Sequence, residues 1–207
     1  MDTLGTPLYP SMDAYLAALP GGVDAHPSAQ AKGAVLRMAL DDDRLKLPPA
    51  TLPPALAAHL QSPPTVNSWI PEAQFNALML AVFDTHFAGA GGHVAYEAWI
   101  LERNRLLLRK PLYRILFAVA SPERILVGAE KRWAAFRRGT KMHIDGHTDT
   151  SVDLSVHYPK NLMSDLSARG LKMALRAAIE LAGAREVAIG FDFVGPEATR
   201  FHGSWKR

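Results

Sequence analysis

The chain has 207 residues, a net charge of +3 and 48% hydrophobic residues, the composition of an ordinary globular protein. It contains no cysteine, which excludes disulfide scaffolds, thiolate metal sites and cysteine nucleophiles. No apolar run approaches the roughly 20 residues that a membrane-spanning helix needs, and residues 1–10 lack the pattern of a signal peptide, so we expect a cytoplasmic protein with no membrane span.

Short helices separated by prolines are predicted in the N-terminal part of the chain. Ser11 is expected to cap a helix that Pro20 ends. A second helix is expected over residues 28–40, where apolar residues recur at helical spacing. Three proline pairs between residues 48 and 64 then enclose one more short helix.

These proline pairs suggest a division of the chain. Residues 1–64 are interpreted as a helical extension with a proline-rich linker, and residues 65–207 as a ligand-binding-like unit. No internal repeat or low-complexity tract interrupts either part. We therefore expect the two parts to form one compact fold.

Two strong helices are predicted next. One begins at Pro71, because proline is favoured in the first turn of a helix, and ends at the glycine run 89–92. The other covers residues 93–109 and is broken or kinked by Pro111, after which apolar residues continue at helical spacing.

A further helix is predicted to open at Ser121 and to reach Arg138. Ser-Pro-Glu is a common helix start, and arginines favour the last turn of a helix. Arg137 and Arg138 would occupy that last turn, and Gly139 would follow the helix end.

The C-terminal stretch 140–206 predicts a β-β-α-β-β unit. Its strands alternate apolar and polar residues around positions 142–144, 152–158, 187–193 and 200–206, and a helix is predicted over 164–182. Such alternation indicates that one sheet face is covered and the other faces solvent. The predicted class is α+β, with a helical N-terminal half packed on one face of a four-stranded antiparallel sheet.

Charge is unevenly distributed along the chain. Residues 102–141 carry eleven basic and three acidic side chains, a net charge of +8 against −5 for the remainder. This asymmetry indicates either an anionic partner or helices with solvated basic faces. No nucleic-acid-binding motif accompanies it, so we do not expect nucleic-acid binding.

Imidazoles and carboxylates recur at every second residue between His143 and Asp149. On a straight strand these side chains would point to one side and could coordinate zinc, manganese or iron. The alternative is a hairpin tip, because Asp145-Gly146 is a strong turn signal that would scatter the side chains. The candidate metal ligands are His143, Asp145 and His147.

Aromatic side chains gather on the central predicted helices. They form either a solid core layer against the sheet or the wall of an apolar cavity with arginines at its mouth. An arginine would anchor an anionic group of a ligand. The candidate residues for a small hydrophobic or anionic ligand are Trp99, Tyr113, Phe117, Trp133, Phe136, Arg114 and Arg137.

The order of these elements resembles that of the superfamily shared by 4-vinyl reductase domains, haem-NO-binding domains and transport-particle subunits. Several local motifs also resemble an uncharacterised myxobacterial family of about 200 residues. The motifs are Pro10-Ser11-Met12, Leu19-Pro20-Gly21-Gly22, Trp69-Ile70-Pro71, Pro111-Leu112-Tyr113-Arg114, Ser121-Pro122-Glu123-Arg124, Arg132-Trp133 and Phe136-Arg137-Arg138-Gly139.

The superfamily resemblance implies a module that binds a small apolar or tetrapyrrole ligand or a protein partner. Two departures limit what it implies. The haem-binding branch carries a Tyr-x-Ser-x-Arg motif that does not occur here, which puts haem in doubt, and the acylated cysteine of the transport-particle branch has no counterpart. The sequence therefore leaves the cofactor unknown.

Three functional hypotheses follow. The first is a non-enzymatic ligand-binding or signalling module with a cavity between the central helices and the sheet. The second is a protein-interaction scaffold or homodimerisation module without a ligand. The third is a metal-dependent enzyme that uses His143, Asp145, His147 and Asp149, although no nucleophile-elbow, zincin or phosphate-loop motif is present.

Overall fold

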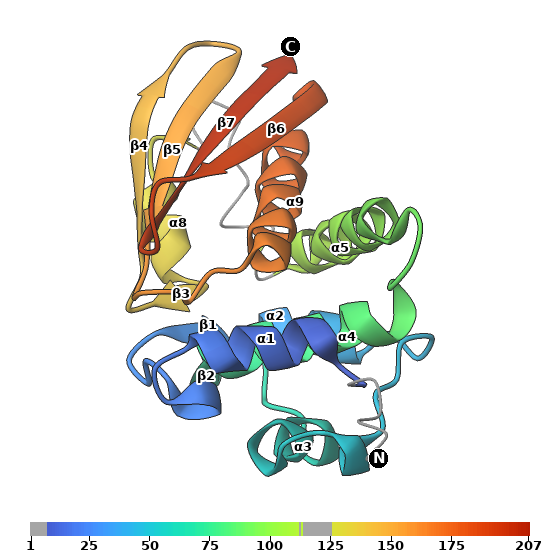
Figure 1. Ribbon diagram of the computed structural model, residues 1–207. Helices are drawn as coiled ribbons and strands as arrows, with labels where there is room; N and C mark the ends of the chain where they lie inside the picture. The colour runs from blue at the N-terminus through green and yellow to red at the C-terminus, as the bar shows by residue number, and fades with distance from the viewer. Residues whose placement is uncertain (1–7, 112, 114–125) are drawn as a thin grey trace.

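The computed structural model describes residues 8–111, 113 and 126–207. A helical N-terminal half packs against a C-terminal unit that contains a four-stranded antiparallel sheet and one long helix (Figure 1). This arrangement confirms the predicted α+β class. Within the described residues, no helix is both long and apolar enough to cross a membrane.

The N-terminal half consists of short helices, two three-residue strands and two longer helices. In chain order they are α1 (Pro10–Ala18), η1 (Gly22–Asp24), β1 (Gln30–Lys32), α2 (Gly33–Leu40), η2 (Pro49–Thr51), α3 (Pro54–Gln61), β2 (Trp69–Pro71), α4 (Glu72–His86) and α5 (Gly92–Arg109). Both strong central helices therefore lie where the sequence predicted them.

The prediction that Ser11 caps the first helix was wrong. Helix α1 begins at Pro10, so its N-cap is Tyr9, which makes no side-chain capping hydrogen bond. Instead, Asp84 of α4 accepts hydrogen bonds from the backbone amides of Ser11 and Met12 through Oδ2, at 2.9 and 3.1 Å. A carboxylate distant in sequence thus satisfies the free amides and complements the helix dipole.

The helix predicted over residues 28–40 was wrong in its first part. Residues 30–32 form β1, the central strand of a small sheet with the order β2-β1-β3, and only α2 continues as a helix. Both partners of β1 lie far along the chain, so helical spacing alone did not reveal the strand. At the junction, a Cβ atom on Gly33 would lie 2.2 Å from the carbonyl oxygen of Thr65, which requires glycine there.

The predicted helix end at Arg138 was also wrong. Helix α8 covers Ala129–Ala134, and Arg137–Arg138 form the short strand β3, which pairs with β1. The predicted start at Ser121 lies outside the described residues. Gly139 has a φ of +69°, and a Cβ atom there would lie 2.5 Å from the carbonyl oxygen of Ser28. The close approach to the segment before β1 therefore excludes a side chain.

The C-terminal unit confirms the predicted β-β-α-β-β order. Its elements are β4 (Lys141–His147), β5 (Ser151–His157), α9 (Asp165–Leu181), β6 (Arg185–Phe193) and β7 (Ala198–Lys206), and the strand order is β4-β5-β7-β6. Alternate residues of β5 and β7 are buried, as expected for a sheet covered on one face. Helix α9, capped by the Ser164 hydroxyl, lies between this sheet and α5 (Figure 1).

Buried hydrogen bonds join the two halves. The carbonyl oxygen of Leu162, in the segment before α9, accepts from the Tyr15 hydroxyl at 2.8 Å and from Nδ2 of Asn76 at 3.0 Å. One apolar core continues from the N-terminal helices to the sheet. The division at residue 64 stays a prediction.

Candidate functional site

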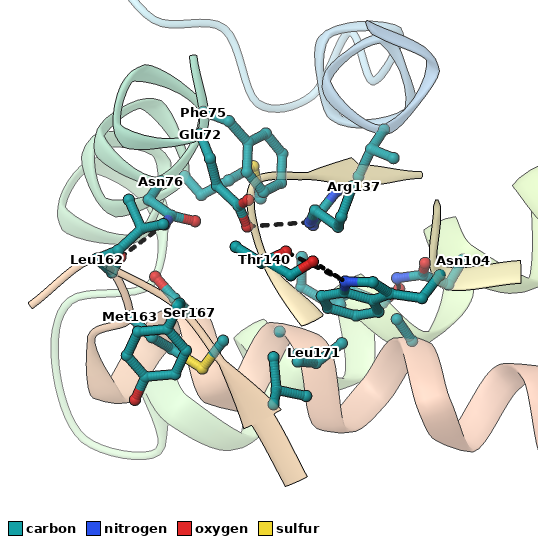
Figure 2. A pocket seen from close by; sticks show the side chains of 18 of the residues that line it. Glu72, Phe75, Asn76, Asn104, Arg137, Thr140, Leu162, Met163, Ser167 and Leu171 are labelled. Atoms are coloured by element: carbon teal, nitrogen blue, oxygen red, sulfur yellow. Dashed lines mark hydrogen bonds and ion pairs between the residues drawn. The ribbon is translucent and has the colours of Figure 1, made fainter. Parts of the chain in front are cut away.

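Two adjoining cavities lie where the helical half meets the C-terminal unit. The larger has a volume of about 140 Å³ and lies among α5, α8, α9 and β4. The smaller has a volume of about 60 Å³ and reaches α2, α4 and β5 (Figure 2). The residues that line both are Val35, Asn104, Trp133, Arg137, Leu171 and Ala174.

Small residues on α9 account for much of this space. Gly170, Ala174 and Ala178 recur at four-residue spacing, so they share one face of the helix, and each lines at least one cavity. A Cβ atom added to Gly170 would meet only the Tyr96 hydroxyl oxygen, at 3.9 Å. The opposite wall of the larger cavity, from α5, carries the bulkier Leu107. The side chains on this face of α9 are therefore too small to fill the cavities.

Glu72 and Arg137 form an ion pair at the smaller cavity. The Arg137 Nε atom lies 3.0 Å from Glu72 Oε1, and Glu72 is only 5% exposed. The guanidinium carbon lies 5.1 Å from the centre of the Phe75 ring and 6.0 Å from that of Trp133. Figure 2 shows the carboxylate from α4 meeting the guanidinium from β3, with Thr140 beside them. The pair links the small sheet to α4 inside the protein.

The second oxygen of Glu72, Oε2, is buried and has no hydrogen-bond partner within the described residues. Burial raises the pKa of the Glu72 carboxyl above its usual range, and Arg137 opposes that rise. A buried carboxylate oxygen without a partner is costly. The site therefore offers an unused hydrogen-bond acceptor on a cavity wall.

Three of the predicted ligand-binding residues lie at the cavities. Trp133 and Arg137 line both, and Phe136 lines the larger. Trp133 donates through Nε1 to Thr140 Oγ1 at 3.1 Å, which orients the indole ring at the wall. Their role in binding a ligand stays a prediction.

The structure describes two of the other four predicted ligand-binding residues, and neither lines a cavity. Trp99 lines neither and donates through Nε1 to Asp42 Oδ2 at 3.0 Å. Tyr113 stacks on Phe136, with ring centres 5.2 Å apart, and lines neither cavity. Arg114 and Phe117 lie outside the described residues.

The predicted metal ligands lie on β4, at the edge of the four-stranded sheet. A β-bulge falls between Ile144 and Gly146, which interrupts the regular alternation. His143 Nδ1 lies 3.2 Å from Glu130 Oε1, and Asp145 Oδ1 accepts from the Ser155 hydroxyl at 3.1 Å.

No group of three or more His, Asp, Glu or Cys side chains in the part of the chain that the structure describes is arranged to hold a metal ion. Coordination by His143, Asp145 and His147 stays a prediction. Elemental analysis of the purified protein tests it directly, because a bound metal would appear in near-stoichiometric amount.

Glu72 is the site residue that the sequence did not reveal. It follows Pro71 at the start of a helix, where a carboxylate ordinarily serves the helix dipole at the surface. No pattern in the neighbouring sequence distinguishes Glu72 from such a surface carboxylate. Its burial and its contact with Arg137 depend on the pairing of β3 with β1, which the sequence analysis missed.

No protein-family model matches the chain, and no curated protein matches it. Solved structures with a similar fold include H-NOX proteins. An unliganded Fe(II) H-NOX mutant from K. algicida has 10% identity and a TM-score of 0.55, covering 85% of this chain and 97% of that one. An H-NOX mutant from T. tengcongensis has 9% identity and a TM-score of 0.55, covering 85% and 98%. The likeness shows a shared fold.

Haem and Fe(II) are named for solved H-NOX proteins, and a haem here would need an iron ligand and a cavity of matching size. Proteins most often hold haem iron through a histidine. All eight histidines of this chain lie in the described residues, and none lines either cavity. Both volumes, about 60 and 140 Å³, are also below the roughly 300 Å³ at which drug-sized pockets begin. These cavities do not fit a histidine-ligated haem.

Proposed function

We propose that this chain is a non-enzymatic ligand-binding or sensing module that holds a small, mainly apolar molecule in the larger cavity. Its fold is shared with H-NOX proteins, one of which is described as an oxygen-binding domain related to soluble guanylate cyclases. The observation that carries the proposal is the apolar space between α5 and α9. The proposal also includes a relationship of this chain to 4-vinyl reductase domains and to the myxobacterial family of about 200 residues.

The size of the larger cavity favours a ligand of about one aromatic ring. An engineered cavity of about 150 Å³ with apolar walls binds benzene. The larger cavity is close to that, at about 140 Å³, and is lined by residues such as Leu107, Leu108, Phe136 and Leu175. Binding would gain dispersion contacts that these side chains now lack.

A route for signalling begins at the same wall. Trp133, at the end of α8, and Arg137, in β3, both line the cavities. Strand β3 pairs with β1, which pairs in turn with β2. A ligand that moves the Trp133 ring would therefore act on the small sheet that joins α2 and α4.

Binding of ethylbenzene tests the proposal. We expect the melting temperature of the wild-type protein to rise with ethylbenzene concentration, because a ligand that binds only the folded state stabilises it. Ala178→Leu should abolish the rise, since Ala178 lines the larger cavity and leucine would fill it. Ala58→Leu, at an exposed position on α3, is the matched control and should retain it.

Native mass spectrometry adds an independent readout of any molecule retained from the expression host. Absence of both a retained molecule and a thermal response in the wild type would rule out this function for the cavity.

The alternative function, a protein-interaction or homodimerisation module, is favoured by one surface feature. Strand β6 is an edge strand, and the adjacent side chains of Phe193 and Val194 near its end are 44% and 53% exposed. Exposed edges with apolar residues pair readily with other chains. Sedimentation velocity of the wild type and of Phe193→Lys tests it. A dimer that Phe193→Lys dissociates would support this alternative.

A further inference from the structure

The acceptor left unused at Glu72 indicates which chemical group a ligand would carry. Oε1 of this carboxylate contacts Arg137 at 3.0 Å, whereas Oε2 is buried and lacks a partner within the described residues. Glu72 is only 5% exposed and lines the smaller cavity. A hydroxyl or N–H group placed beside Oε2 would supply the missing hydrogen bond.

The neighbouring charges favour an uncharged donor. Arg137 already balances the carboxylate, so a cationic ligand would lie beside a guanidinium and an anionic ligand beside Glu72. Desolvating a third charge would add a further cost. A neutral donor satisfies Oε2 without either repulsion.

The two cavities together define the shape of this ligand. Arg137 and Trp133 border both, so the two cavities adjoin at these side chains. The inferred ligand spans them, with its ring in the larger cavity and a short substituent in the smaller one. The larger cavity, at about 140 Å³, suits a single ring. The smaller, at about 60 Å³, suits a substituent of one or two heavy atoms or a few water molecules.

We propose that the cavities bind an uncharged aromatic molecule whose hydroxyl or neutral N–H group donates a hydrogen bond to Oε2 of Glu72. This inference rests on the proposed function, because it assigns the polar end of the ligand that the larger cavity would hold. A simple probe of this class is benzyl alcohol. Ethylbenzene is its matched counterpart, since a methyl group replaces the hydroxyl at nearly constant shape.

Calorimetric titration of benzyl alcohol, ethylbenzene and benzoate into the wild-type protein tests the donor. We expect benzyl alcohol to bind at least as tightly as ethylbenzene although it is less apolar, and benzoate to bind weakest.

Variants then assign the preference to Glu72. Glu72→Ala would leave the partly buried Arg137 without its counter-charge and risks unfolding the chain. The double variant Glu72→Met with Arg137→Met removes both charges at similar side-chain length. It should reduce the preference for benzyl alcohol over ethylbenzene about tenfold or more, the effect of losing a hydrogen bond to a charged group.

Glu97 and Lys172 supply a matched control. They form an ion pair with a 2.7 Å contact between α5 and α9, and neither lines a cavity. Glu97→Met with Lys172→Met should leave the preference as in the wild type.

The outcomes separate this inference from the function on which it rests. If ethylbenzene binds but the hydroxyl gives no gain in affinity that depends on Glu72, the donor assignment is overturned and water is the group that satisfies Oε2. The apolar binding site would stand in that case. If benzoate binds tightest, the site selects anions through Arg137 and the inference is wrong. If no probe binds the wild type, the proposed function and this inference both fail. If the double variant does not fold, the wild-type series still tests the donor, because an affinity for benzyl alcohol below that for ethylbenzene overturns it.

Discussion

Arg137 Nε lies 3.0 Å from Oε1 of Glu72, although the two residues are 65 positions apart in the sequence. This contact joins β3 of the small sheet to the first turn of α4. Both residues also line the smaller cavity. The stability of the fold and the chemistry of the cavity therefore depend on the same pair.

Removal of Arg137 alone is expected to be severely destabilising. Arg137→Met should lower the free energy of unfolding by about 3–5 kcal/mol, because it leaves the Glu72 carboxylate buried without its counter-charge. The double variant with Glu72→Met should recover most of that loss, since no charge stays buried. Urea denaturation of the wild type, both single variants and the double variant measures the coupling. Additive effects would show that the two residues do not stabilise one another.

Acidic pH should stabilise the protein through Glu72. Burial raises the folded-state pKa of this carboxyl above 4.5, its value in the absence of the protein environment. The folded protein then binds the proton more tightly than the unfolded chain does. The resulting stabilisation is fully present below about pH 4.5 and is lost as pH rises through the folded-state pKa.

Glu72→Gln cannot titrate and should lack this contribution to the pH dependence. The measurement is the free energy of unfolding of both proteins from about pH 4 to pH 8. Identical slopes would contradict the prediction.

Asp42 should show the opposite pH dependence. A side-chain hydrogen bond from Arg44 holds the pKa of Asp42 well below its usual value of 3.8, and Trp99 Nε1 also donates to it. Its stabilisation is present above about pH 4 and is lost as pH falls toward the folded-state pKa. Asp42→Asn should therefore be destabilising at neutral pH and much less so near pH 2, by the same denaturation series. A cost that does not change with pH would contradict the assignment.

Gly170→Ala should stabilise the protein by about 1 kcal/mol. Alanine is favoured over glycine within a helix by about that amount, and the added methyl group enters the smaller cavity without a close contact. Gly183→Ala is the matched control. The added Cβ atom would also have open space there, but Gly183 has a φ of +95°, whereas Gly170 lies within a helix. Gly183→Ala should destabilise by about 1 kcal/mol, the order of the strain of a left-handed alanine. Equal effects in thermal unfolding would contradict both interpretations.

The cap supplied by Asp84 can be tested against the residue that the sequence suggested. Asp84→Ala should lower the free energy of unfolding by about 1 kcal/mol, because the backbone amides of Ser11 and Met12 lose their acceptor. Ser11→Ala should have little effect, because Ser11 is not the N-cap of α1, which is Tyr9. A larger loss of unfolding free energy from Ser11→Ala than from Asp84→Ala would show that Ser11 caps the helix after all.

Local signals were sufficient for much of the fold. The period-two alternation in β5 and β7 predicts strands with one buried face, and the wide apolar face of α9 predicts its burial between a sheet and other helices. Proline and glycine marked the ends of α4 and α5. Each of these signals acts within one turn or one strand, so the chain itself specifies them.

Tertiary structure decided the small sheet and the candidate site. Strands β1 and β3 are two or three residues long and have no detectable period, so only their pairing creates them. That pairing also ends the helix that was expected to reach Arg138. Burial of Glu72 follows from that pairing. The cavities arise because Gly170 and Ala178 oppose side chains of other elements that cannot fill the gap, a relationship between surfaces that no stretch of sequence contains.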